Sequence, residues 1–164
     1  MNRLLLVIGC ILFFTISSLA QADSFDVFTY ITPEFFTKSL LPSSAKFNLT
    51  NPDNNNCTIT LYKSQPATDS VIHDVMRQWN ERVVKRLRKA SAKPVRILTE
   101  QLWDGWVSTL AIGNYYVGKK KSVVMLNSFR KNMTSACVVY AFTDKFFKGP
   151  IENFSQNLHL VTPE

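Results

Sequence analysis

Cations are the chemically active side chains that this sequence concentrates in one place. The segment 76–96 holds eight Lys or Arg residues against one acid, Glu81, and this local excess equals the net charge of +7 of the whole chain. The candidate binding face consists of Arg82, Lys85, Arg88 and Lys89. Such side chains attract anionic groups, so the pattern predicts contact with an acidic partner or an anionic membrane surface. The alternative is that these charges are only the solvent face of an amphipathic helix.

Aromatic side chains form a second candidate site. A pocket for a small ligand or a glycan could be lined by Trp103, Trp106, Tyr115 and Tyr116. Alternating aromatics are also what a half-buried strand needs in order to pack against a helix, and we favour this packing role. A small-ligand carrier with an aromatic pocket between helix and sheet is therefore the alternative function.

The remaining reactive residue types form no recognisable catalytic or metal-binding set. The two histidines, His73 and His159, have no partner at metal-ligand spacing. The serines lack a nucleophile elbow and the glycines form no phosphate-cradling loop. We therefore predict a non-enzymatic protein with no cofactor and no bound metal.

The first 22 residues have the three parts of a secretory signal peptide. Arg3 precedes an apolar run over 4–16, and the run is followed by Ala20-Gln21-Ala22, which predicts cleavage after Ala22. The apolar run is shorter than the about 20 residues that a transmembrane helix needs. We expect a single mature domain over 23–164, periplasmic or secreted and without a transmembrane segment, for which nucleic acid is an unlikely partner and an envelope protein or anionic surface is favoured.

Two cysteines, Cys57 and Cys137, remain in that mature domain. In an oxidising compartment they could form a disulfide, and they could equally be two buried thiols. Both alternatives stay open at this point. The short leader and the few cysteines favour a bacterial over a eukaryotic secretory origin.

Periodicity predicts the elements that carry these side chains. An N-cap at 68–70 begins a helix that continues to about Ala90, before Pro94. The segment between Pro33 and Pro42 is expected to form a turn or a short helix, and a second short helix is expected to begin at Pro150. Strands are predicted at 24–30, 45–51, 57–64, 95–101, 106–116, 121–130 and 135–142. The fold class is α+β, with an antiparallel sheet of about six to seven strands packed against one long amphipathic helix and a short C-terminal helix.

Three short motifs resemble those of a known fold group. The strand "CTITLY" at 57–62 leads through "PATDS" at 66–70 into a helix that bears Trp79, and Trp106 follows Asp104-Gly105. In this order the motifs resemble small exported bacterial proteins with a PsbP-like fold. The resemblance implies an antiparallel sheet flanked by helices and a non-enzymatic accessory or binding role. It implies no active-site residue in this sequence. The function expected is that of an exported accessory or binding protein at the cell envelope.

Overall fold

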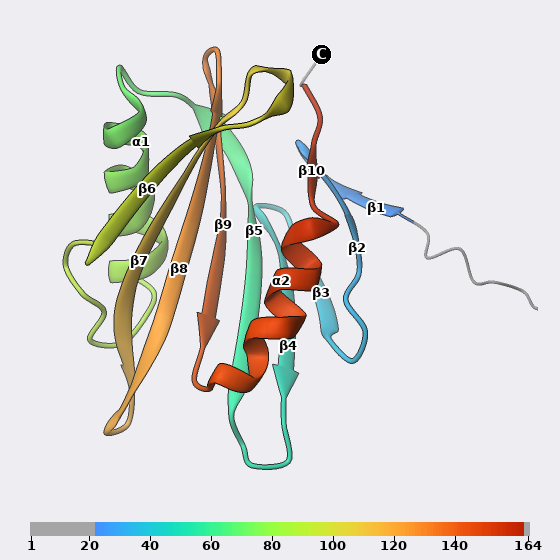
Figure 1. Cartoon of the computed structure of the whole chain (residues 1–164), viewed down its shortest axis with the longest axis vertical. Helices are drawn as coiled ribbons and strands as arrows, with labels where there is room; N and C mark the ends of the chain where they lie inside the picture. The colour runs from blue at the N-terminus through green and yellow to red at the C-terminus, as the bar shows by residue number, and fades with distance from the viewer. Residues whose placement is uncertain (1–21, 163–164) are drawn as a thin grey trace, which may run out of the picture.

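The main feature of the molecule is one antiparallel sheet of seven strands. A computed structural model of the chain describes residues 22–162, and within it the strand order is β3-β4-β5-β9-β8-β7-β6 (Figure 1). The strands are β3 (Thr37–Leu41), β4 (Ser44–Thr50), β5 (Asn56–Pro66), β6 (Arg96–Gln101), β7 (Val107–Val117), β8 (Lys120–Lys131) and β9 (Thr134–Phe142). The predicted antiparallel pairing is confirmed, because β4 pairs with β5 in a hairpin and β6 to β9 pair in succession. The α+β class is confirmed as well.

A second sheet of three short strands lies beside the first. It contains β1 (Ala22–Phe25), β2 (Phe28–Ile31) and β10 (His159–Leu160). The single strand predicted at 24–30 is wrong, because a turn with Asp26 at φ 55° divides it into β1 and β2. Asp tolerates this left-handed conformation, and the Asp26 carboxylate also accepts a hydrogen bond from the backbone N–H of Ser64 at 2.6 Å.

The segment between Pro33 and Pro42 was expected to be a turn or a short helix. Its second half is instead the edge strand β3, which pairs with β4 from Thr37 to Leu41. Tertiary pairing to β4 thus decides the structure of this segment, since its own apolar residues show no clear period of two.

The helical region is shorter than predicted. The helix α1 (Val71–Gln78) begins at the expected N-cap, where the Ser70 hydroxyl accepts a hydrogen bond from the backbone N–H of His73 at 3.3 Å. It passes into a wider π-helical stretch, η1 (Trp79–Val84). The prediction that the helix continues to Ala90 is wrong, because only turns follow Val84.

The chain leaves the helix because its backbone finds partners on the edge of the sheet. Three N–H groups link this segment to β7: Tyr116 N donates to Arg88 O (3.1 Å), Ser91 N to Asn114 O (2.8 Å) and Val95 N to Ile112 O (2.7 Å). Lys89 adopts a left-handed φ of 53° within the turn. These bonds satisfy backbone groups that a longer helix would have paired internally.

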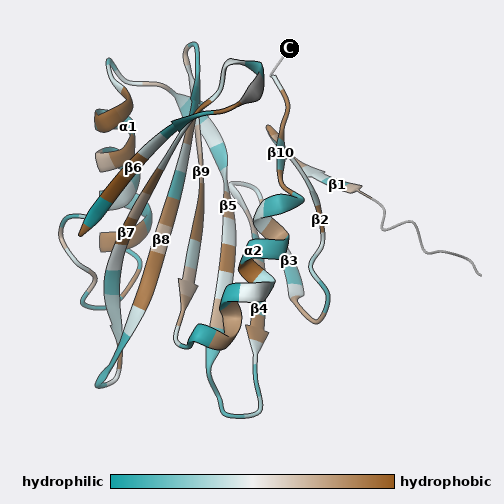
Figure 2. Ribbon diagram, in the orientation of Figure 1, coloured by the Kyte–Doolittle hydropathy of each residue, from teal (hydrophilic) through white to brown (hydrophobic). Residues whose placement is uncertain are grey.

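The two faces of the large sheet carry two separate cores. On one face, the helix α2 (Lys148–Gln156) contributes Ile151 and Phe154 to a cluster with Phe47 and Tyr140. On the other face, α1 and η1 contribute Val75, Trp79 and Val83, which pack against strand residues such as Ala111, Val124 and Leu126. The two helices therefore lie on opposite sides of the sheet (Figure 1), and the ribbon of α2 alternates between hydrophilic and hydrophobic residues (Figure 2). No helix within residues 22–162 is long and apolar enough to cross a membrane.

A buried carboxylate attaches α1 to the sheet. Asp74 is fully buried, and its two oxygens accept hydrogen bonds from Arg130 on β8 (2.8 Å), Arg77 (3.2 Å) and the backbone N–H of Thr68 (2.8 Å). Arg130 also donates to the carbonyl of Thr68 at 2.8 Å. One carboxylate therefore joins the start of α1, the preceding loop and the central strand β8.

Replacement of Asp74 by Asn is expected to lower the free energy of unfolding by about 3 kcal/mol, because it leaves two partly buried arginines without their counter-charge. Asp69→Asn is the control. Asp69 also lies near the start of α1, but its side chain is 73% exposed and pairs only with His73, so its replacement should leave the stability nearly unchanged. Urea unfolding measures both variants, and equal effects would contradict this role of Asp74.

Gly113 on β7 gives Trp79 the room to lie flat on the sheet. A Cβ at Gly113 would lie 2.7 Å from two atoms of the Trp79 ring, which is fully buried. Gly113→Ala is therefore expected to destabilise the protein by about 1 to 3 kcal/mol through overpacking. Gly149→Ala in α2 meets no atom within 4 Å and should be neutral or slightly stabilising. If denaturant unfolding gave both variants the same free energy of unfolding, the conclusion that Gly113 makes room for the Trp79 ring would be contradicted.

Candidate anion-binding groove

A groove lies on the sheet face that α1 and η1 leave partly uncovered. The helical segment covers β7, β8 and β9 on this face, so the outward side chains of β4 and β5 remain open beside it. The groove has a volume of about 480 Å³. It is lined by Leu41, Ser43, Ser44, Lys46, Thr58, Thr60, Tyr62, Arg82, Arg86, Leu87, Tyr115, Val139 and Ala141.

Three cations and no acid line this groove. Lys46 comes from β4, while Arg82 and Arg86 come from η1 and the turn after it, on the other side of the groove. Among residues 22–162, none of the three lies within 4.0 Å of a carboxylate oxygen in an ion pair. Glu81 shares an adjoining hollow with Arg82 and Arg86, but the three cations outnumber it. The concave surface therefore keeps a local positive potential, which attracts anions.

Arg82 is held in place by an aromatic ring. Its guanidinium lies 4.5 Å from the centre of the Tyr62 ring, a cation–π contact. The Nε atom of Arg82 is buried and no protein group in the described part of the chain accepts its hydrogen bond. Burial raises the pKa of Tyr62, against the opposing influence of Arg82 and Arg86, so the phenol is neutral at physiological pH. The groove therefore offers donors and fixed positive charge.

The structure divides the basic face that the sequence predicted. Arg82 lines the groove, and Lys85 lies in an adjoining shallow hollow with Glu81. Arg88 and Lys89 do not belong to a helix face, because they lie in the turn that bonds to the edge of β7. The prediction of one helical face bearing all four cations is therefore wrong.

Two groove residues were missed as site residues at the sequence level. Arg86 belongs to the basic run but was not placed on the binding face, and Lys46 stands alone in a strand. The available signal for Lys46 was its polar position between the buried residues Ala45 and Phe47, which places it on the opposite face of the sheet. Nothing in the sequence indicates that this face meets Arg82.

The aromatic residues do not line a common pocket. Trp106 is buried in the core cluster on the α2 side of the sheet, whereas Tyr115 belongs to the cluster under α1. Tyr116 follows Tyr115 in the same strand, so it points to the opposite face and is 37% exposed. The backbone of Trp103 lies in a short turn at 103–105, and its side chain is outside the described part of the structure. The predicted pocket of these four residues is thus not formed.

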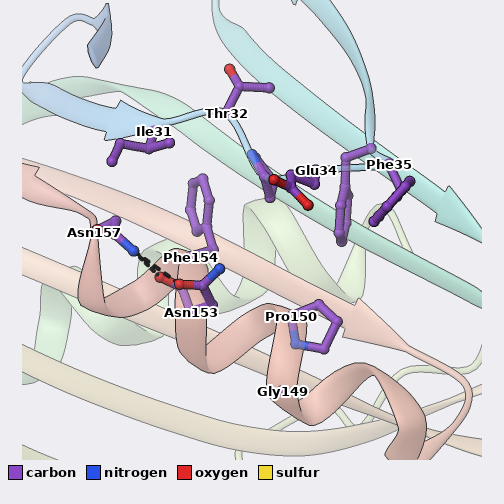
Figure 3. A pocket seen from close by; sticks show the side chains of 11 residues that line it. Ile31, Thr32, Glu34, Phe35, Gly149, Pro150, Asn153, Phe154 and Asn157 are labelled. Atoms are coloured by element: carbon purple, nitrogen blue, oxygen red, sulfur yellow. Dashed lines mark hydrogen bonds between the residues drawn. The ribbon is translucent and has the colours of Figure 1, made fainter. Parts of the chain in front are cut away.

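A second hollow of about 490 Å³ lies between the β2–β3 connection and α2 (Figure 3). It is lined by Ile31, Thr32, Pro33, Glu34, Phe35, Phe36, Gly149, Pro150, Asn153, Phe154 and Asn157. Phe35 is 87% exposed and has a left-handed φ of 66°. The side-chain amide of Asn157 donates to the backbone and side-chain oxygens of Asn153 at 2.8 and 3.0 Å. Apart from Glu34 the lining is uncharged, so this hollow has no attraction for anions.

The two cysteines are free thiols on opposite faces of the sheet. Cys57 on β5 lies opposite Phe142 in the α2-side core, while Cys137 on β9 lies opposite Tyr62 in the other core. The register separates them by five residues along the strands, about 16 Å, whereas a disulfide needs Cα atoms within about 7 Å. The disulfide alternative is therefore wrong. Burial raises the pKa of each thiol to about 12. No group of three potential metal ligands occurs among residues 22–162.

Comparison with known proteins identifies the fold. No family model matches the chain, and no curated protein matches it. The solution structure of cyanobacterial PsbP (CyanoP) from Synechocystis sp. PCC 6803 is similar, with a TM-score of 0.54. The likeness covers 85% of this chain and 91% of that chain, at 12% sequence identity. The PsbP-like fold that the sequence motifs predicted is therefore confirmed, and at this identity the likeness concerns the fold alone.

The free thiols lead to a prediction about reactivity. At pH 8 a thiol with a pKa of about 12 is ionised in only about one molecule in ten thousand, so Cys57 and Cys137 should resist a thiol reagent in the native protein. Both should react at once in denaturant, with or without prior reduction. Because the pKa is raised in the folded state, stability should fall as the pH rises above about 9, where the unfolded thiols ionise. If the number of cysteines that react in denaturant rose only after reduction, the two cysteines would be joined in a disulfide and the prediction of free thiols would be contradicted.

Proposed function

We propose that this chain is an exported, non-enzymatic accessory or binding protein that acts at the cell envelope and contacts an acidic partner or anionic surface. The contact region is the groove over β4 and β5 together with the exposed cations at its rim. The observation that supports this proposal most directly is that Lys46, Arg82 and Arg86 line one groove with no acid among its lining residues. The proposal that the protein is exported rests on the signal-peptide pattern of the first 22 residues. Residues 1–21 lie outside the described part of the structure.

The chemistry of the groove favours binding over catalysis. Its lining contains hydroxyl groups but no His, Asp, Glu or Cys that could act as a general base beside them. Arginine and lysine keep their charge throughout the neutral pH range and hold anions without reacting with them. These groups are suited to recognition of negative charge.

Surface placement supports the same proposal. Lys85 and Arg86 are exposed just after η1, at the rim of the groove, and Lys85 shares the adjoining hollow with Arg82. Charges in these positions can meet a partner too large to enter the groove. The groove would then receive one protruding anionic group of that partner.

A small-ligand carrier remains the second candidate function. Its support is now the hollow between the β2–β3 connection and α2, where Phe36, Pro150 and Phe154 provide apolar surface. This hollow is formed on the α2 side of the sheet, away from the basic groove. The affinity of a ligand bound in this hollow would not depend on the charges around η1.

Paired charge reversals test the first function against the second. Lys85→Glu with Arg86→Glu removes the cations at the groove rim. Lys145→Glu with Lys148→Glu gives the same net charge but changes one exposed lysine in the turn before α2 and one at the start of α2, on the opposite side of the sheet. Binding to heparin and to vesicles with anionic lipid is measured for both variants and the original chain, at two salt concentrations.

The groove variant is expected to bind at least tenfold more weakly, since each cation near an anionic surface is worth about 1 kcal/mol and each is inverted here. The control variant should bind nearly as well as the original, and raised salt should weaken all three. Equal losses in both variants would show that only net charge matters and would defeat the proposed contact region.

A further inference from the structure

We propose that the groove over β4 and β5 is a phosphate-binding subsite, in which Lys46, Arg82 and Arg86 hold the phosphate of an organic ester. The inference rests on the basic groove of the proposed function and goes further, because it assigns the chemical class of the ligand. The three cations approach from two sides, Lys46 from the sheet and the two arginines from η1 and its following turn.

The number and kind of donors fit phosphate better than carboxylate. A phosphate monoester carries between one and two negative charges at neutral pH and has three strong acceptor oxygens. A carboxylate has one charge and two oxygens, so it would offset only one of the three groove charges and could not give each cation an oxygen of its own. Arginine binds phosphate through two parallel N–H groups and lysine binds it as a point charge. One phosphate group therefore has an oxygen for each of the two arginines and the lysine, and it offsets more of their charge of +3 than a carboxylate does.

Arg82 is prepared for this role before any ligand arrives. Its guanidinium lies over the Tyr62 ring, 4.5 Å from the ring centre, and this cation–π contact restrains its position. Among the described residues no carboxylate pairs with Arg82, so its terminal N–H groups remain available to an anion. The Nε atom is buried without a protein acceptor among the described residues, and a buried donor ordinarily has a partner. Because Nε has almost no accessible surface, the terminal guanidinium nitrogens would bind a phosphate oxygen first, and a rotation of the Arg82 side chain would bring Nε to it.

Neutral hydroxyls complete the polar part of the groove. Thr58 and Thr60 come from β5, Ser44 is the first residue of β4, and Ser43 lies in the turn before it. A hydroxyl can donate to a phosphate oxygen and does not repel it. The Thr58 hydroxyl already donates to the side-chain oxygen of Asn48 at 3.1 Å, so the hydroxyls of Thr60, Ser43 and Ser44 are the better candidates.

Apolar residues in the same groove favour an organic phosphate over the inorganic ion. Leu41 and Leu87 stand on opposite sides of the groove, and Val139 and Ala141 on β9 form part of its floor. These side chains offer contact to the carbon portion of a phosphate ester. The ester could be a lipid headgroup or a soluble metabolite, which share the phosphate chemistry and are distinguished by the experiment.

The test is an NMR titration of the ¹⁵N-labelled protein with four probes. They are inorganic phosphate, glycerol 3-phosphate, a short-chain phosphatidic acid below its micelle concentration, whose headgroup is also a phosphate monoester, and acetate as the carboxylate comparison. The Nε–H signal of Arg82 and the backbone signals of 58–62 should shift with an organic phosphate. Acetate should bind at least tenfold more weakly. A response to glycerol 3-phosphate indicates a soluble ester, and a response to the lipid alone indicates a headgroup.

Three variants connect the shifts to the groove. Lys46→Gln should weaken the organic phosphate at least tenfold, and Arg82→Lys, which keeps the charge but loses the planar fork and Nε, should weaken it about fivefold or more. Lys148→Gln, on the opposite side of the sheet, should leave the affinity unchanged. The inference is overturned if no phosphate probe moves the Arg82 Nε–H signal, if acetate binds equally well, or if all three variants behave alike.

The two proposals can fail separately. If phosphate probes leave the groove signals unchanged while the Lys85 and Arg86 reversal still abolishes heparin binding, the basic contact region stands and the phosphate subsite is wrong. If an organic phosphate binds in the groove while the reversal and its control bind heparin and vesicles equally, the subsite stands and the larger contact region is wrong.

Discussion

The position of α1 depends on the buried ion pairs of Asp74. A carboxylate without exposure is stable only if it is fully paired, and here Arg77, Arg130 and the backbone of Thr68 provide its partners. These contacts fix the start of the helix over β8. The placement of η1 follows from that anchor, and with it the point at which Arg82 reaches Tyr62. A structural interaction at one end of the helix thereby sets the geometry of the groove at the other end.

The close fit of Trp79 on the sheet decides where the helix ends. Its ring covers Gly113, and its indole N–H donates to the carbonyl of Ser91 at 2.9 Å. The Ser91 hydroxyl and backbone bond in turn to Asn114 on β7. Because this segment is bound to the sheet edge, Arg88 and Lys89 are carried away from the helix axis while Arg86 remains beside the groove. The same contacts therefore stabilise the fold and determine which cations lie beside the groove.

The alternation of side chains across the sheet explains the other outcomes. Residues an odd number of positions apart along paired strands face opposite sides, which separates Cys57 from Cys137 and Tyr115 from Tyr116. Each face has its own helix and its own apolar core. In a sheet that is covered on both sides, aromatic residues such as Trp106 are buried in the cores. Side chains of the sheet remain accessible only where neither helix covers them. The groove occupies one such position, over β4 and β5.

The sequence alone determined the α+β class, the antiparallel sheet, the N-cap at Ser70 and the PsbP-like motifs, because caps, turns and periodicity are local properties of the chain. It also located the excess of positive charge. Only the tertiary structure decided where the helix ends, which face of the sheet each strand residue occupies, and that Lys46 lines the same groove as Arg82 and Arg86. Those facts depend on edge hydrogen bonds, strand register and the placement of α1 by Arg130, which joins residues 56 positions apart in the sequence. Periodicity shows that successive side chains of a strand alternate between the two faces of the sheet. Packing between distant segments decides which other residues they contact there.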